Sequence, residues 1–305
     1  MSTASFSTSI GEHVLDLVWS LWAELGVSSW TRRHQQWAID PEPLILFTAY
    51  LSESDRRLRD ETVDWCIRYG GYVSASRLRN LLKDASPDEH SAFETFAAAV
   101  NAHSDHHWPS AAQAPRYEPT RRSSKLSFTA PALIALRLRA LFGVAARADI
   151  LRVLVAEPDR HFIASDLVPD VNFTKRNIDN ALDSLRMAGV LENRPVRNQH
   201  QYRLTEPARL LAFVGERPRL YPRWTPIFRC LAPILQLAAR ADEFSPPVAM
   251  VEASRAFREI LPFVEAAGLM RPGVQVGGAN AWQTFVSWAD ELSRRLAAGD
   301  AGALE

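Results

Sequence analysis

The feature that most constrains the fold is the order of patterns between residues 145 and 205. An apolar helical segment, 145–156, is followed by a short piece, 163–168, and by a second helix that opens near Thr174. A polar stretch with the character of a hairpin then runs over residues 190–204. This succession predicts a small domain of helices closed by a two-stranded hairpin.

The helix of residues 174–188 has two clearly different faces. Its apolar stripe recurs at i, i+4 and i+7 and consists of Ile178, Leu182 and Leu185. Successive residues are rotated by about 100°, so the opposite face carries Arg176 and Asn180. Thr174 fits the cap before the helix, and Gly189 fits its end. The spacing therefore predicts a helix that is buried on one side and polar on the other.

Residues 190–205 have the pattern of two extended arms. The arms are 190–196 and 199–205, with Arg197 and Asn198 near the tip. Pro195 suits an edge strand, because proline has no backbone N–H to donate to a central ladder. We therefore expect a two-stranded wing after the amphipathic helix.

This order of elements resembles the winged helix-turn-helix regulators of the broad MarR/ArsR-like kind. The resemblance covers residues 133–215, about a quarter of the chain, and is carried by segments 149–154, 164–167, 177–191 and 202–205. It implies a sequence-specific, double-stranded DNA-binding transcriptional regulator that is repressor-like. In such a protein the helix 174–188 reads the major groove, and the wing 190–204 contacts the backbone or minor groove.

Arg176 and Asn180 are the first candidates for base contacts, because they lie one turn apart on the outward face. Arginine can donate two hydrogen bonds to guanine, and asparagine can form a matching pair with adenine. Wing residues would reach phosphates or the minor groove. The full set of candidate DNA-binding residues is Thr174, Lys175, Arg176, Asn177, Asn180, Ser184, Arg160, Arg194, Arg197, Asn198 and His200.

The formal net charge of the chain is zero, but basic residues are concentrated around the predicted winged helix. Residues 1–115 hold nine basic and 15 acidic side chains, residues 116–215 hold 16 and 10, and residues 216–305 hold ten of each. The excess of six positive charges in residues 116–215 lies in the segment that would bind a polyanion such as DNA.

Two carboxylates interrupt the basic character of the recognition helix. Asp179 and Asp183 could pair with Lys175 and Arg186 along the helix, or one of them could accept a hydrogen bond from cytosine. If neither holds, we expect modest DNA affinity.

The expected fold class is mainly α, with a helical N-terminal domain, a central winged helix-turn-helix with a two-stranded wing, and a C-terminal helical bundle. The apolar faces of the terminal helices could hold a homodimer or form an intrachain core. The expected parts are a helical N-terminal domain at 1–102, a linker at 103–130, the winged helix-turn-helix domain at 131–215 and a C-terminal helical domain at 216–305.

The predicted linker has no apolar period and contains several prolines. Its metal-capable side chains are His103, Asp105, His106 and His107. Their spacing suits no shared helical face, so we expect solvated histidines and no metal site. Its basic end consists of Arg116, Arg121, Arg122 and Lys125. This end could lie along phosphates, or it could belong to a plain flexible linker.

Two features of the N-terminal region involve charged residues within or next to predicted helices. Residues 66–82 look loosely like a second helix-turn-helix with Arg77 and Arg79 available, but the net acidic charge of this region favours an αα-hairpin. Asp40 and Glu42 fall at a helix terminus, where carboxylates complement the helix dipole.

Composition excludes several functional classes. Cys66 and Cys230 give no disulfide framework and no C-x-x-C motif, so we expect buried free thiols and a cytoplasmic location. No stretch approaches the roughly 18 apolar residues that span a bilayer, so no membrane partner is expected. Phosphate-loop, dinucleotide, nucleophile-elbow and zinc-protease motifs do not occur. We therefore expect neither an enzyme nor a cofactor.

An alternative to DNA binding is a protein-interaction or scaffold module. It would use the winged helix and the Trp-rich helical domain, for example as the partner of a toxin or defence protein. Such a module would not bind duplex DNA at low salt, whereas a regulator would.

Overall fold

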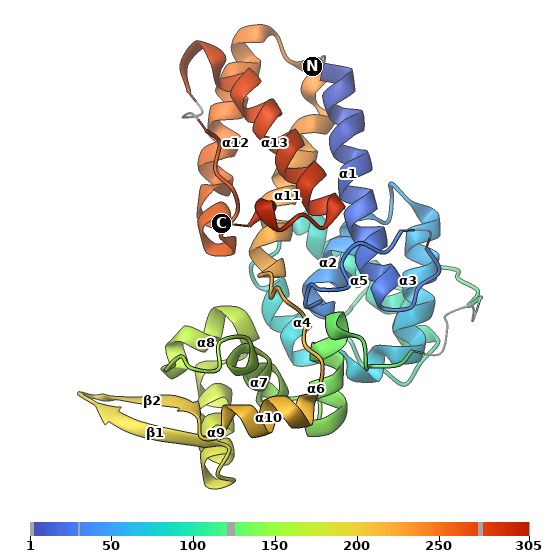
Figure 1. Ribbon diagram of the computed structural model, residues 1–305. Helices are drawn as coiled ribbons and strands as arrows, with labels where there is room; N and C mark the ends of the chain where they lie inside the picture. Colours follow the sequence, from blue (N-terminus) through green and yellow to red (C-terminus); the bar gives the residue numbers. More distant parts are fainter. Residues whose placement is uncertain (1–2, 30, 121–125, 274–276, 305) are drawn as a thin grey trace. The chain divides into compact units, whose positions relative to one another are not determined.

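The computed structural model describes residues 3–29, 31–120, 126–273 and 277–304. The described fold is mainly helical with a two-stranded antiparallel sheet, which confirms the predicted class (Figure 1). The chain forms two compact units. The first unit comprises Met1–Leu25, Ser29–His34 and Pro222–Glu305, and the second comprises Gly26–Ser28 and Gln35–Tyr221.

The first unit is a helical bundle. Its long helices are α1 (Thr3–Glu24), α11 (Trp224–Ala239), α12 (Pro246–Ala267) and α13 (Ala281–Ala298), and 3-10 turns lie at Ala241–Glu243, Gly278–Asn280 and Ala301–Ala303. α1 packs against α11 and α13, and α12 packs against the same two helices. The apolar stripes of α11 and α13, with Ile227, Leu231, Phe285 and Leu292 fully buried, are used inside this bundle. They favour the intrachain core over a dimer contact.

The second unit has two halves, which we call the helical half (residues 35–120) and the winged-helix half (residues 126–221). The helical half contains α2 (Pro41–Leu51), α3 (Arg56–Tyr69), a 3-10 turn (Gly70–Tyr72), α4 (Ala75–Leu82) and α5 (Pro87–Ala102). The winged-helix half contains a 3-10 turn (Pro131–Leu133), α6 (Ile134–Phe142), α7 (Ala146–Ala156), α8 (Ala164–Val171), α9 (Lys175–Met187), β1 (Leu191–Val196), β2 (Gln199–Leu204) and α10 (Pro207–Val214).

These units divide the chain differently from the boundaries expected at residues 102 and 216. α1 belongs with α11–α13, while α2–α5 belong with the winged helix. The reason is that the stripe of α1, which includes Ile10, Val14 and Leu21, is buried against helices more than 200 positions away in the sequence. Periodicity within one helix shows that it has a buried face but does not identify what covers that face.

The segment expected to be a flexible linker is packed, over residues 103–120, against the helices of the helical half, and we call these residues the strap. Trp108 is buried, and its backbone N–H and C=O both bond the Asn101 side chain at 3.0 Å. The ring of His106 lies so close to Gly70 that a Cβ there would meet it at 2.5 Å. Single aromatic residues anchor the strap, so its sequence shows no apolar period even though it is packed. Residues Arg121, Arg122 and Lys125 lie outside the described part of the chain.

Both cysteines are buried free thiols, as their apolar helical surroundings predict. Burial raises the pKa of the Cys66 thiol well above its usual value, and it raises the pKa of Cys230 to about 12. These thiols are therefore protonated and unreactive at neutral pH.

Candidate nucleic-acid interface

α9 has the two faces that its spacing predicts. The hydroxyl oxygen of Thr174 accepts a hydrogen bond from the Asn177 backbone N–H at 3.4 Å and caps the helix. The buried residues of α9 are Ile178, Ala181, Leu182 and Leu185. They pack in one core with residues of α7, α8 and the wing, including Leu154, Leu167 and Tyr202. Burial of the stripe holds the opposite face toward solvent.

The outward face of α9 is exposed at the positions predicted for base contacts. Lys175, Arg176, Asn177 and Asn180 are all exposed. Within the part of the chain that the structure describes, none of these four side chains has a hydrogen-bond or ion-pair partner. Ser184 is different, because its half-buried hydroxyl donates to the Asn180 backbone oxygen at 3.0 Å. The face therefore offers two cations and two amides to a ligand.

The two carboxylates on α9 have different surroundings. Asp183 lies 3.5 Å from Arg186, which is the pairing expected along the helix, whereas no pairing of Asp179 with Lys175 occurs among the described residues. Burial, then the charges of Asp183 and Asp179, raise the pKa of Tyr202 at the base of the wing. Both carboxylates therefore add negative charge on the side of α9 that faces the wing.

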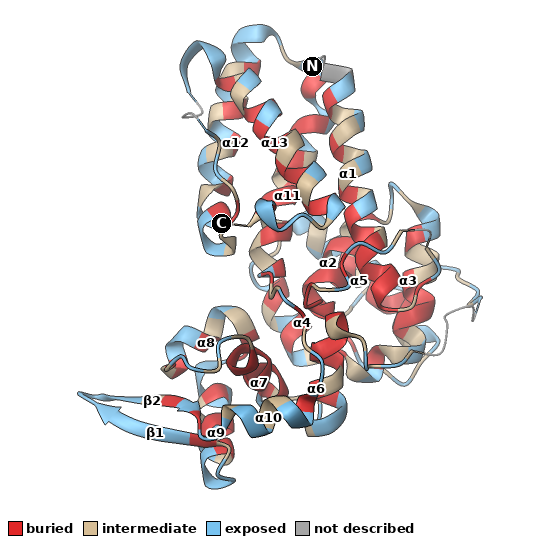
Figure 2. Cartoon of the chain, in the orientation of Figure 1, coloured by how far each residue is buried: buried red, intermediate tan, exposed pale blue. Residues whose placement is uncertain are grey.

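The wing is a two-stranded hairpin that projects from the core (Figure 2). Leu191 pairs with Leu204, and both are buried, whereas most of the ribbon beyond them is exposed. Tyr202 also forms an isolated antiparallel bridge with Phe162, with hydrogen bonds of 2.8 and 2.9 Å, which secures the base of the wing. The sequence pattern does not predict this bridge, because one paired residue leaves no alternation.

The wing tip holds two of the predicted contact residues. Arg197 has a φ of 54° and Asn198 follows it in the two-residue turn between the strands. Hairpins of this length need a positive φ at the first turn position, which is uncommon for arginine. Both side chains are exposed and have no hydrogen-bond or ion-pair partner among the described residues.

Other predicted wing contacts already have partners within the hairpin. Arg194 donates to the Gln201 side chain at 3.0 and 3.1 Å. His200 shares a 3.1 Å hydrogen bond with Asn193, and Arg203, which was not among the predicted contacts, pairs with Glu192. Since these pairs are exposed, a phosphate could compete for the arginines at small cost.

Arg160 lies two residues before Phe162, which forms the bridge to the wing. Its guanidinium bonds the Glu157 carboxylate at 3.0 and 3.1 Å and lies 4.7 Å from the centre of the Phe162 ring. The pair neutralises part of the positive charge expected there. Arg160 is therefore a weaker phosphate candidate than Arg197.

A buried ion cluster joins the two halves of the second unit. It consists of Asp40, Glu42, Arg77, Arg139, Asp149 and Arg152, all of them buried. Three carboxylates face three guanidinium groups, so the formal charges cancel. A buried charge without such a partner would be strongly destabilising.

Bidentate contacts connect the members of the ion cluster. Arg77 on α4 donates to both carboxylate oxygens of Asp40 at 2.6 Å and also to Glu42. Arg139 on α6 donates to Glu42 at 2.7 and 2.9 Å and to Asp149 on α7 at 2.9 Å. Burial alone would raise the pKa of Asp40, but the charge and hydrogen bonds of Arg77 hold it well below its usual range.

Two arginines of the ion cluster, Arg77 and Arg152, also position the start of α9. Three consecutive carbonyls at the end of α8 accept hydrogen bonds from side chains of other helices. The pairs are Arg152 to Asp170 at 2.8 Å, Arg77 to Val171 at 2.9 Å and Asn80 to Asn172 at 3.0 Å. Asn172, with a φ of 52°, reverses the chain into α9. Carbonyls that a helix end leaves unpaired are thereby satisfied, and the turn before α9 is fixed.

The ion cluster bears on two interpretations of the sequence. Arg77 is fully buried and cannot contact a nucleic acid, which agrees with the αα-hairpin favoured for residues 66–82 over a second helix-turn-helix. Asp40 and Glu42 bind arginines from other helices and do more than complement a helix dipole. The sequence did contain a signal for the ion cluster. Arg77 lies next to Leu78 and Leu81, and a charge within an apolar stripe requires a buried partner.

No group of three or more His, Cys, Asp or Glu side chains suited to a metal ion occurs among the described residues. Among the helices that the structure describes, none combines the length and apolar character that a bilayer crossing requires. Comparisons of the chain with family models, curated proteins and solved structures found no match.

Proposed function

We propose that this chain binds double-stranded DNA in a sequence-specific manner through α9 and the wing. The observation that carries the proposal is the outward face of α9, where Arg176 and Asn180 are exposed and unpaired within the described residues while the opposite stripe is fully buried. An α-helix fits the major groove, and these two side chain types read guanine and adenine there. The excess of basic residues in 116–215 supports the same proposal.

Arg176 and Asn180 are separated by about 6 Å along the helix axis, at a rise of roughly 1.5 Å per residue. The spacing of bases along one strand is about 3.4 Å, so the two side chains would contact bases about two steps apart. Lys175 lies on the first turn and would contact a phosphate. The wing tip, with Arg197, would reach the backbone or the minor groove.

The resemblance to MarR/ArsR-like proteins extends this proposal to transcriptional regulation of a repressor-like kind. A bound duplex segment at a promoter would block access of other proteins to it. The ion cluster would hold α9 in a fixed orientation against the major groove, because its arginines fix the turn before the helix.

Replacing Arg176 with alanine is expected to weaken binding to the preferred duplex by about 5- to 150-fold, equivalent to about 1–3 kcal/mol. The preference at one base pair should also disappear, because alanine cannot form the paired hydrogen bonds to guanine. Duplexes selected by the wild type and titrated by fluorescence anisotropy would measure both effects. Arg57→Ala, which removes an exposed arginine from α3, is the control and should bind like the wild type.

Replacing Arg197 with alanine is expected to weaken binding to all duplexes alike. The plot of log binding constant against log salt should become shallower by about 0.9, the value for loss of one phosphate contact. Titrations at several salt concentrations on two unrelated duplexes would measure this. A loss confined to one sequence would assign Arg197 to base reading instead.

A protein-interaction role is the second candidate, and exposed apolar groups favour it. Met187 at the end of α9 is 74% exposed, and Phe213 on α10 is 65% exposed. A contiguous exposed apolar patch is typical of surfaces that bind other proteins, and these two side chains would contribute to one. Failure of the wild type to bind any duplex at low salt would favour this role.

A further inference from the structure

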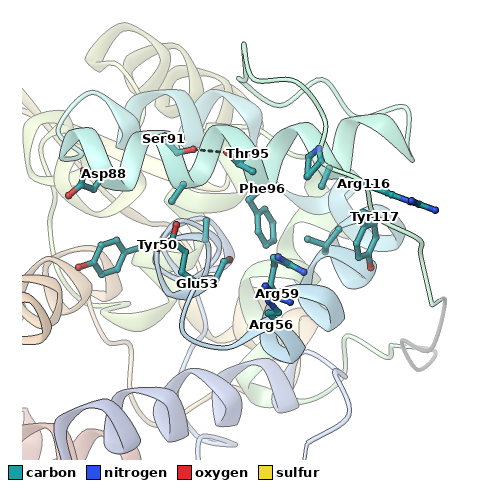
Figure 3. Close-up of a pocket in the computed structure, with 16 residues that line it drawn as sticks. Tyr50, Glu53, Arg56, Arg59, Asp88, Ser91, Thr95, Phe96, Arg116 and Tyr117 are labelled. Carbon is teal, nitrogen blue, oxygen red and sulfur yellow. Dashed lines mark hydrogen bonds between the residues drawn. The ribbon is translucent and has the colours of Figure 1, made fainter. Parts of the chain in front are cut away.

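The helical half contains a pocket with a volume of about 620 Å³ that is separate from α9 and the wing. It lies between the end of α2, α3, α5 and residues 115–117 of the strap (Figure 3). Its volume falls within the range of small-molecule sites, about 300–1,000 Å³. The pocket is therefore large enough for a ligand of one or two rings.

The floor of this pocket is apolar. Ala49, Val63, Phe96 and Ala99 line it and are each less than 5% exposed. The Phe96 ring points into the centre of the cavity in Figure 3. A flat apolar group would bury its surface against these side chains.

The rim of the pocket carries three arginines. Arg56 and Arg59 of α3 lie together on one side of Phe96, and Arg116 of the strap lies on another (Figure 3). Arg59 bonds Asp60 at 2.8 Å, whereas the guanidinium groups of Arg56 and Arg116 have no partner among the described residues. Two carboxylates also line the pocket, so its lining has a net charge of +1. They are Glu53 and Asp88.

The strap wall of the pocket is held in place before any ligand binds. The Tyr117 hydroxyl donates to the Asp64 carboxylate and lies equally close, at 2.9 Å, to the Asp60 carbonyl. The Thr120 backbone N–H bonds the same carboxylate at 3.0 Å, and its hydroxyl donates to it as well. Burial of Tyr117, together with the hydrogen bond to Asp64, raises its pKa well above the usual value, so it stays a donor. A prebuilt wall reduces the entropic cost of binding.

We propose that this pocket binds an amphipathic organic anion. The apolar body of the ligand lies on Phe96 and Ala99, and its carboxylate or sulfonate accepts charge-assisted hydrogen bonds from Arg56 and Arg59. Arg116 covers the ligand from the strap. This binding does not depend on whether α9 binds DNA.

The test compares two fluorescent probes of nearly the same shape. Anilinonaphthalene sulfonate carries an anionic group, and phenylnaphthylamine lacks it. We expect the full-length protein to bind the sulfonate at least tenfold more tightly than the neutral probe. In the double variant Arg56→Gln/Arg59→Gln the sulfonate should lose about tenfold or more in affinity, with little change for the neutral probe.

Two further variants distinguish binding in the pocket from binding elsewhere on the protein surface. Arg57→Gln, on the same helix but outside the pocket, should bind both probes like the wild type. Ala92→Trp fills the pocket and should abolish binding of both, with an unchanged circular dichroism spectrum as the check on folding. Equal affinities for the two probes, or sulfonate binding that survives the double arginine variant, would overturn the proposal.

Discussion

Replacing Arg77 with methionine is expected to lower the free energy of unfolding by about 3–5 kcal/mol. The methionine side chain fills similar space but leaves the buried Asp40 without its main cationic partner and leaves Glu42 paired with Arg139 alone. It also removes the donor to the Val171 carbonyl, so the turn before α9 loses support. Urea denaturation followed by circular dichroism would measure the change.

Arg79→Met is the matched control for this prediction, because Arg79 lies two residues away on α4 and is exposed. Its effect should stay within about 0.5 kcal/mol, as is usual for surface substitutions. If the two variants unfolded at the same urea concentration, the ion cluster would not be what joins the two halves of the second unit.

Between pH 6.5 and about 4 the protein is expected to lose about 3 kcal/mol of stability through His34 alone. This side chain is fully buried in the first unit, where its ring nitrogens bond the Ser20 hydroxyl and the Leu296 carbonyl, each at 2.8 Å. A carbonyl only accepts, so the Nε2 atom carries a proton and donates it to Leu296, and the lowered pKa keeps the ring neutral at pH 7. Burial lowers the pKa of His34 from 6.5 to about 4.

The sign follows from the folded-state pKa being lower than the unfolded one. Well above pH 6.5 neither state binds the proton, so His34 has no effect there. As the pH falls toward about 4, the unfolded chain binds a proton that the folded chain excludes, and stability decreases.

Urea midpoints measured between pH 4 and 7.5 would test this, with His34→Gln as the comparison. The variant should show a flatter dependence on pH in that interval, whatever its stability at pH 7.5. Parallel curves for the two proteins would show that His34 titrates normally in the fold.

The local features of the fold could be predicted from the sequence because they repeat at short range. The stripe of Ile178, Leu182 and Leu185, the cap at Thr174 and the tip at Arg197 depend on neighbours within a few residues. The same spacing argument predicted which face of α9 would be exposed. Such features follow from helix and hairpin geometry alone.

The long-range features could not be predicted in the same way. The partner of α1 lies in α13, and the partners of Arg77 include residues at the start of α2 and the end of α8, so no spacing along the chain relates them. The strap has the sequence pattern of a linker because its anchors, Trp108 and Tyr117, are single residues without a period. Packing between distant segments is set by shape and charge, which the pattern within one segment does not contain.

The sequence predicted which candidate interface residues are exposed better than it predicted which of them have hydrogen-bond partners within the protein. Arg176, Asn180 and Arg197 are exposed as expected, while Ser184 is bonded within α9 and Arg194 is bonded to the neighbouring strand of the wing. Partners of that kind depend on rotamers and on strand register. A residue type at the right position therefore identifies a candidate contact but not its availability.

Selection from a library of random duplexes by the purified full-length chain, followed by sequencing, tests the proposed function most directly. The wild type should enrich one motif, and Arg176→Ala should lose the preference at a single position of that motif while keeping the others. No enrichment by the wild type, together with no duplex binding at about 50 mM salt, where phosphate contacts are strong, would contradict DNA recognition by α9.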